Sequence, residues 1–93
     1  MNIKVEFSAQ MKNAIGRATE EFTLDSGATV QALVRQIASR EAEPLQNFLL
    51  GDNGALGGSI LLFLNDEQIL WPTPVELKDG DTLTIATPIA GGI

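Results

Sequence analysis

The chain has 93 residues, no cysteine, no histidine and a formal net charge of −6. This length supports one domain, and a hydrophobic fraction of 44% is enough to build a core. Only six Lys and Arg oppose twelve Asp and Glu and no basic stripe is visible, so we expect neither nucleic acid nor a membrane as a partner. The start of the chain alternates polar and apolar residues and does not resemble a signal peptide, which predicts a cytoplasmic protein.

The first part of the chain predicts a hairpin. Apolar residues alternate with polar ones from Ile3 to Phe7, which is the period of a half-buried strand. Ala9 to Arg17 contains Asn13 and Gly16, and is interpreted as a turn or short loop. A second strand is expected from about Ala18 to Leu24.

An amphipathic helix follows, with Thr29 as its expected N-cap. Its apolar residues fall on one helical face, and the helix should end before Pro44. The residues of that face are Val30, Leu33, Val34, Ile37 and Ala38, and those expected on the polar side are Gln31, Arg35, Gln36 and Arg40.

The rest of the chain predicts short elements separated by turns. We expect a helical turn at Leu45 to Leu50, a mobile glycine-rich loop from Gly51 to Ser59 and a strand from Ile60 to Leu64. After these come a turn at Asn65 to Glu67, a short strand from Gln68 to Leu70, an irregular segment at Trp71 to Pro74, a tight turn at Asp79 to Asp81 and a last strand from Thr82 to Thr87.

This order predicts an α+β fold, with one main helix packed on one face of a mixed sheet. The domain should cover residues 1–87, and residues 88–93 should form a flexible tail that carries Gly91-Gly92. The expected core joins Val30, Leu33, Val34 and Ile37 of the helix to strand residues Ile3, Val5, Phe7, Ile60, Leu62, Leu64, Leu83 and Ile85.

No pattern indicates a catalytic site, a bound cofactor or a metal site. Serine catalysis needs a neighbouring base, usually histidine, and metal sites favour His and Cys. The glycines from Gly51 to Gly58 precede a strand and have no lysine beside them, which is not the order of a phosphate-binding loop. We therefore predict that the protein is a substrate on which another enzyme acts, or a binding module, and not an enzyme.

The diglycine near the end of the chain suggests chemistry performed by a partner. Glycine lets a chain thread a narrow channel, and a glycine carboxylate has no Cβ to hinder attack at its carbonyl carbon. Such an end can be adenylated, and a nucleophile can then displace the adenylate group from its carbonyl carbon. Pro88 ends the sheet and directs the following residues away from it. A frayed terminus without function is the alternative interpretation.

Four segments along nearly the whole chain resemble the MoaD/ThiS family of ubiquitin-like sulfur carriers. They are Ile3 to Phe7, Thr29 to Leu33, Phe63-Leu64-Asn65-Asp66-Glu67, and the closing stretch from Leu77 through Asp79-Gly80-Asp81 to Gly92. The closing stretch is the most specific, because it places Asp-Gly-Asp and Gly-Gly at the separation typical of the family.

The resemblance implies a β-grasp fold and an activating adenylyltransferase of the ubiquitin-activating type, which would use ATP and Mg. Gly92 would be the acceptor and Gly91 its flexible neighbour, with Ala90 before them. The resulting thiocarboxylate would donate sulfur, through a sulfur-accepting synthase, in molybdopterin, thiamine or amino-acid biosynthesis.

The sequence departs from the family at Ile93, which follows the second glycine. A peptidase could remove Ile93, the extra residue could be tolerated, or carrier function could be lost; we favour removal. Two further functions stay open: a modifier conjugated to lysines, and a binding-only β-grasp subunit.

Leu61 and Phe63 are candidates for a partner interface. Alternation places both side chains opposite Leu62, on a sheet face that one helix would leave uncovered. The alternative is burial under the Trp71-Pro72 loop or against a second copy.

Overall fold

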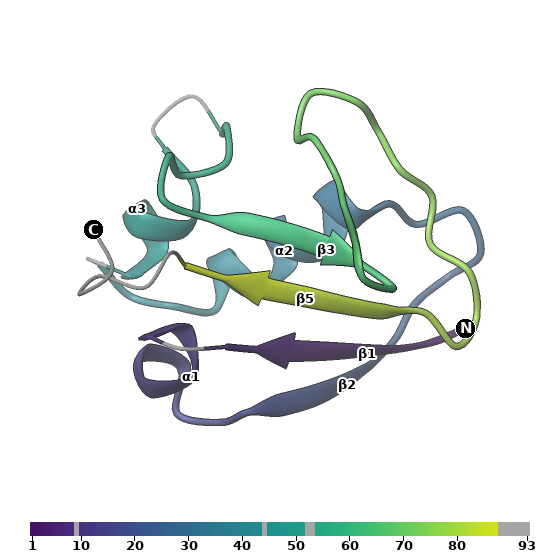
Figure 1. Ribbon diagram of the computed structural model, residues 1–93, viewed down its shortest axis with the longest axis horizontal. Helices are drawn as coiled ribbons and strands as arrows, with labels where there is room; N and C mark the ends of the chain where they lie inside the picture. Colours follow the sequence, from purple (N-terminus) through teal and green to yellow (C-terminus); the bar gives the residue numbers. More distant parts are fainter. Residues whose placement is uncertain (9, 44, 52–53, 88–93) are drawn as a thin grey trace.

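A five-stranded mixed sheet organises the molecule, with strand order β2-β1-β5-β3-β4 (Figure 1). The computed structural model describes residues 1–8, 10–43, 45–51 and 54–87. The parallel pair is β1 with β5, and the other neighbours run antiparallel. The elements are β1 (Asn2–Phe7), α1 (Gln10–Ile15), β2 (Thr19–Thr23), α2 (Val30–Ser39), α3 (Leu45–Leu49), β3 (Leu61–Leu64), β4 (Glu67–Gln68) and β5 (Thr82–Ala86).

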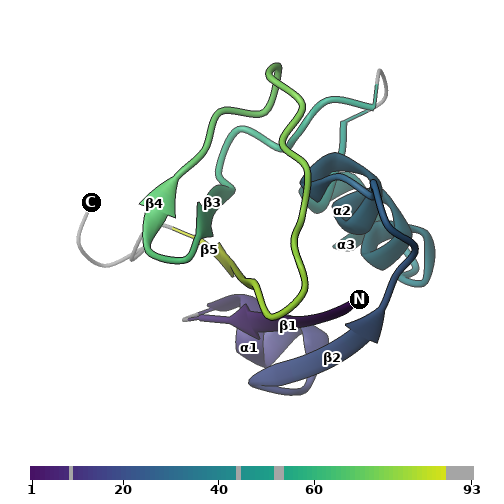
Figure 2. The same ribbon diagram turned by 90° about the vertical axis from the view of Figure 1, so that its right-hand side faces the viewer.

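Helix α2 forms as its pattern predicts. The Thr29 hydroxyl oxygen accepts a hydrogen bond from the Ala32 amide at 3.1 Å, which satisfies a donor that the first helical turn leaves free. Both α2 and α3 lie on the same side of the sheet (Figure 2). The prediction of a main helix packed on one face of a mixed sheet is confirmed.

The predicted core is confirmed. The helix and strand residues expected there are buried in one cluster, except that Leu64 is half-buried and packs against that cluster. The cluster also contains residues that the predicted helix–sheet core did not include: Met11, Phe22, Ala38, Leu49 and Leu77.

Two predictions about local structure are wrong. Residues 10–15 form helix α1 and not a loop, because Met11 enters the core and the Met11 amide donates to the Ser8 carbonyl at 3.0 Å. Gln31 is only 6% exposed, although the helical pattern placed it on the polar side of α2. Its amide group makes hydrogen bonds to backbone groups of the loop that follows β4, and these bonds compensate the free-energy cost of burying a polar side chain.

The remaining boundaries differ by one or two residues. β3 begins at Leu61, one residue after the predicted start. β4 contains Glu67 and Gln68, so it begins earlier and ends sooner than the predicted strand from Gln68 to Leu70. Gly80 has a φ of 88°, as expected for the tight turn before β5.

Candidate functional site

Leu61 and Phe63 lie on the outer face of the sheet, opposite the side that α2 and α3 cover. Leu61 pairs with Ala86 of β5, and Phe63 pairs with Thr84. Both side chains are half-buried and do not belong to the core cluster found among the described residues. Trp71 of the following loop packs against the core. The placement of the pair agrees with the prediction, and its role in binding stays a prediction.

Leu70 extends this outer face, and the sequence analysis did not single it out. The Ile69 amide donates to the Leu62 carbonyl at 3.0 Å, which continues the pairing of β4 with β3 by one residue. Ile69 packs against the core, so alternation turns Leu70 outward, where it is 69% exposed. We name Leu61, Phe63 and Leu70 the outer apolar patch. The alternation of Ile69 and Leu70 was the signal that could have identified it.

The turn motifs behind the family resemblance have structural roles. Asn65 and Asp66 have φ values of 49° and 74°, as a two-residue hairpin turn requires. The Asn65 side chain donates to Asp81 Oδ1 at 2.8 Å and accepts from the Thr82 amide at 2.9 Å. Asp79 Oδ1 accepts from the Asn2 amide at 2.6 Å. These bonds tie the β3–β4 turn and the start of β1 to the turn that leads into β5.

The outer apolar patch lies beside the strand that leads to the diglycine. β5 is the middle strand of the sheet and ends at Ala86, the pairing partner of Leu61. Thr87 follows and is buried, 6% exposed. The predicted acceptor Gly92 and the tail residues Ala90, Gly91 and Ile93 lie outside the described residues. A partner that binds the patch would therefore contact the sheet directly before the chain segment that carries the diglycine.

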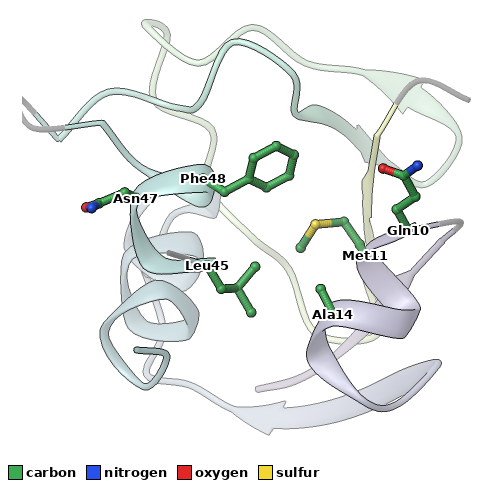
Figure 3. Close-up of a pocket in the computed structure, with 6 residues that line it drawn as sticks. All are labelled: Gln10, Met11, Ala14, Leu45, Asn47 and Phe48. Carbon is green, nitrogen blue, oxygen red and sulfur yellow. The ribbon is translucent and has the colours of Figure 1, made fainter. Parts of the chain in front are cut away.

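A hollow of about 530 Å³ lies on the other side, between α1 and α3 (Figure 3). Its lining is apolar apart from two amide side chains, and consists of Gln10, Met11, Ala14, Leu45, Asn47 and Phe48. None of these side chains ionises at ordinary pH, so the described lining of the hollow offers no acid, base or nucleophile. Within the described part of the chain, no group of three or more His, Cys, Asp or Glu side chains could hold a metal ion.

The clearest electrostatic feature joins β2 to the end of α2. Arg40 makes two hydrogen bonds to the Glu20 carboxylate, at 2.6 and 3.0 Å, and Arg17 lies 3.6 Å from the same carboxylate. The bonds from Arg40 lower the pKa of Glu20 below its usual value and raise the pKa of Arg40. This pair is distant in sequence from the outer apolar patch and fastens an edge strand to the main helix.

Comparison with known proteins decides the family. Residues 5–92 match the ThiS family model, which covers nearly the whole chain and reaches the diglycine. The chain belongs to the ThiS family. The resemblance drawn from the four sequence segments is confirmed.

Solved structures similar to this ThiS-family chain support the same fold. SAMP1 from Haloferax volcanii is 25% identical, with 99% of this chain and 100% of that chain covered and a TM-score of 0.83. The small archaeal modifier protein 1 from Methanosarcina acetivorans is 26% identical over 98% and 96%, with a TM-score of 0.73. A chain of the Amycolatopsis orientalis BexX/CysO complex is 28% identical over 97% and 99%, with a TM-score of 0.68. The fold is the ubiquitin-like β-grasp.

None of the curated proteins matches this ThiS-family chain. Small ubiquitin-like proteins of this family act as carriers or modifiers and not as catalysts, in agreement with the prediction that the chain is not an enzyme. Among the described residues, every helix is too short or too polar to cross a membrane.

Proposed function

We propose that this protein is a sulfur carrier whose Gly92 carboxylate is adenylated by a ubiquitin-activating-type enzyme with ATP and Mg. A carboxylate oxygen attacks the α-phosphorus and pyrophosphate leaves. Hydrosulfide then attacks the carbonyl carbon, AMP leaves and a proton is lost, which gives the thiocarboxylate. The thiocarboxylate donates sulfur to a synthase in molybdopterin, thiamine or amino-acid biosynthesis. The observation that carries the proposal is the ThiS family match over residues 5–92, which includes both glycines.

Gly92 must first be released from its peptide bond to Ile93. Adenylation acts on a free carboxylate, and the carbonyl of Gly92 in this sequence is bonded to the Ile93 nitrogen. The proposal therefore includes a peptidase that hydrolyses this bond before activation.

The test is ATP–pyrophosphate exchange with the activating enzyme of the same cell. The chain that ends at Gly92 should support exchange and the chain with Ile93 should not. Gly92→Val in the trimmed chain should abolish exchange, because a glycine-sized channel has no space for the added side chain. Equal exchange with and without Ile93 would contradict the peptidase step, and exchange by neither would contradict the carrier proposal.

The binding face is tested separately. Changing Leu61 and Phe63 together to Ser should weaken binding of the activating enzyme while the melting temperature changes little, because both side chains lie outside the core. Unchanged binding would reject this face as the interface.

One observation favours a second function, that of a protein modifier. The Methanosarcina acetivorans protein similar to this chain is named a small archaeal modifier protein. The same activated glycine would then be transferred to a lysine amine of a target. Intact-mass analysis of the native protein separates the two: replacement of one carboxylate oxygen by sulfur marks the carrier, and lysine-linked adducts mark the modifier.

A further inference from the structure

A buried amide of α2 holds the loop that follows β4. Gln31 Nε2 donates to the carbonyl oxygens of Trp71 and Thr73, both at 2.9 Å, and Gln31 Oε1 accepts from the Val75 amide at 3.2 Å. One side chain thus satisfies three backbone groups of a segment without regular structure. Replacing it would free all three groups at once.

Both ends of the same loop are also fixed. At its start, the Ile69 amide bonds to Leu62 of β3. At its end, the Val30 amide donates to the Val75 carbonyl at 2.8 Å. Between them, the Arg35 guanidinium lies 5.4 Å from the centre of the Trp71 ring. The loop from Ile69 to Val75 is therefore held against the helix and the sheet along its length.

This fixed loop nevertheless exposes an apolar side chain. Leu70 is 69% exposed. Alternation with Ile69, which pairs with Leu62 and packs on the core, places it on the outer side with Leu61 and Phe63. A single exposed leucine needs no explanation, but one that continues an apolar face is typical of an interface. A side chain on a preorganised loop loses little conformational entropy on binding, which favours affinity.

The charges beside the loop indicate what the partner surface carries. The segment from Gln68 to Val75 has no charged residue, whereas Asp66 and Glu67 at the preceding turn are exposed and have no ion pair among the described residues. An apolar pocket for Leu70 with Lys or Arg at its rim would match both features.

We propose that Leu70, positioned by Gln31 through the Ile69–Val75 loop, inserts into an apolar, basic-rimmed pocket of the activating enzyme. This inference rests on the proposed function and adds a second anchor to the face formed by Leu61 and Phe63. Gln31 is a positioning residue, because it acts on the partner only through the loop.

The experiment measures the affinity of the activating enzyme for four chains: wild type, Leu70→Ala, Gln31→Met and the double variant. Gln31→Met has similar length and fills the same space without the three hydrogen bonds. We expect Leu70→Ala to weaken binding about tenfold, as for an interface anchor, and Gln31→Met to weaken it by a similar factor. The double variant should be little weaker than either single variant, because both changes remove the same contact.

The matched controls are Phe48→Ala and Gln36→Met. Phe48 is also an exposed large apolar residue, but it lies on α3, on the covered side of the sheet, and Gln36 lies on the exposed side of α2. Neither should change the affinity. Asp66→Asn with Glu67→Gln should slow association and reduce its dependence on salt.

Failure of this inference can be distinguished from failure of the proposed function. If the Leu61 and Phe63 double change weakens binding but Leu70→Ala does not, the second anchor is overturned and the proposed face stands. Additive effects of Gln31→Met and Leu70→Ala would overturn the positioning role of Gln31. An effect of Leu70→Ala on binding of the sulfur-accepting synthase alone would overturn the assignment to the activating enzyme.

Discussion

Gly57 lies where the chain after α3 returns against the end of that helix. The Gly57 amide donates to the Leu49 carbonyl at 2.8 Å, and a Cβ at this position would overlap the Phe48 carbonyl oxygen. We expect Gly57→Ala to destabilise the fold by about 1–3 kcal/mol, because backbone atoms must move to admit the methyl group. Urea unfolding measures this.

Gly58→Ala is the control for that substitution, since a Cβ there would meet no heavy atom within 4 Å. It should leave stability unchanged or raise it slightly, by lowering the entropy of the unfolded chain. Equal stability of the two variants would contradict the close approach at Gly57.

Glu20 provides a prediction about pH. Its hydrogen bonds from Arg40 lower its pKa, so the ionised carboxylate stabilises the folded state above its unfolded pKa, and this contribution is lost as pH falls through the folded pKa. Glu20→Gln should cost at most about 1 kcal/mol at neutral pH, since Arg40 is partly exposed and screened by solvent. The difference from wild type should vanish well below pH ~4.

Unfolding free energies measured across the acid range test this dependence. Glu21→Gln is the matched control, because Glu21 is exposed and has no ion pair among the described residues. Its difference from wild type should be small at every pH. A Glu20→Gln difference that grows as pH falls would have the wrong sign for this ion pair.

At the scale of elements, the apolar period could predict a helix only where the helix was long enough and buried one whole face. The five apolar positions of α2 repeat over nearly three turns, so its face and its N-cap could be predicted. Helix α1 has six residues and one fully buried side chain, Met11, which is too little for a period to appear. The helical pattern placed Gln31 on the polar side of α2 because the sequence does not show that a distant loop offers backbone carbonyls to its amide group.

The N-cap of α2 can be tested directly. Thr29→Ala removes the acceptor for the Ala32 amide and should cost about 1 kcal/mol of unfolding free energy. Thr29→Ser keeps the hydroxyl and should retain most of the stability. Thermal or urea unfolding of both variants decides: if alanine is as stable as serine at position 29, the cap contributes nothing.

At the scale of the whole molecule, topology assembles the candidate site from separate parts of the sequence. Alternation alone predicted that Leu61 and Phe63 share a face. That this face adjoins Ala86, the last residue of the strand before the tail, depends on the antiparallel pairing of β3 with β5, which no local pattern specifies. The predicted strand from Gln68 to Leu70 contains Leu70, but its face depends on the pairing of Ile69 with Leu62. The attachment of the following loop to α2 depends on Gln31.

The central position of β5 leads to a final prediction about cooperativity. β5 joins the β1–β2 hairpin to the β3–β4 hairpin, and its second residue, Leu83, is fully buried, paired with Val5 on one side and Leu64 on the other. Leu83→Ala should cost about 2–5 kcal/mol, a large part of the 5–15 kcal/mol expected for a domain of this size. Leu70→Ala removes the same side chain from an exposed position and should change stability by less than about 0.5 kcal/mol.

Because β5 connects both halves of the sheet, Leu83→Ala should lower the urea midpoint while near-ultraviolet and far-ultraviolet signals still change together. Separate transitions for the two signals would show that the hairpins unfold independently and that β5 does not couple them.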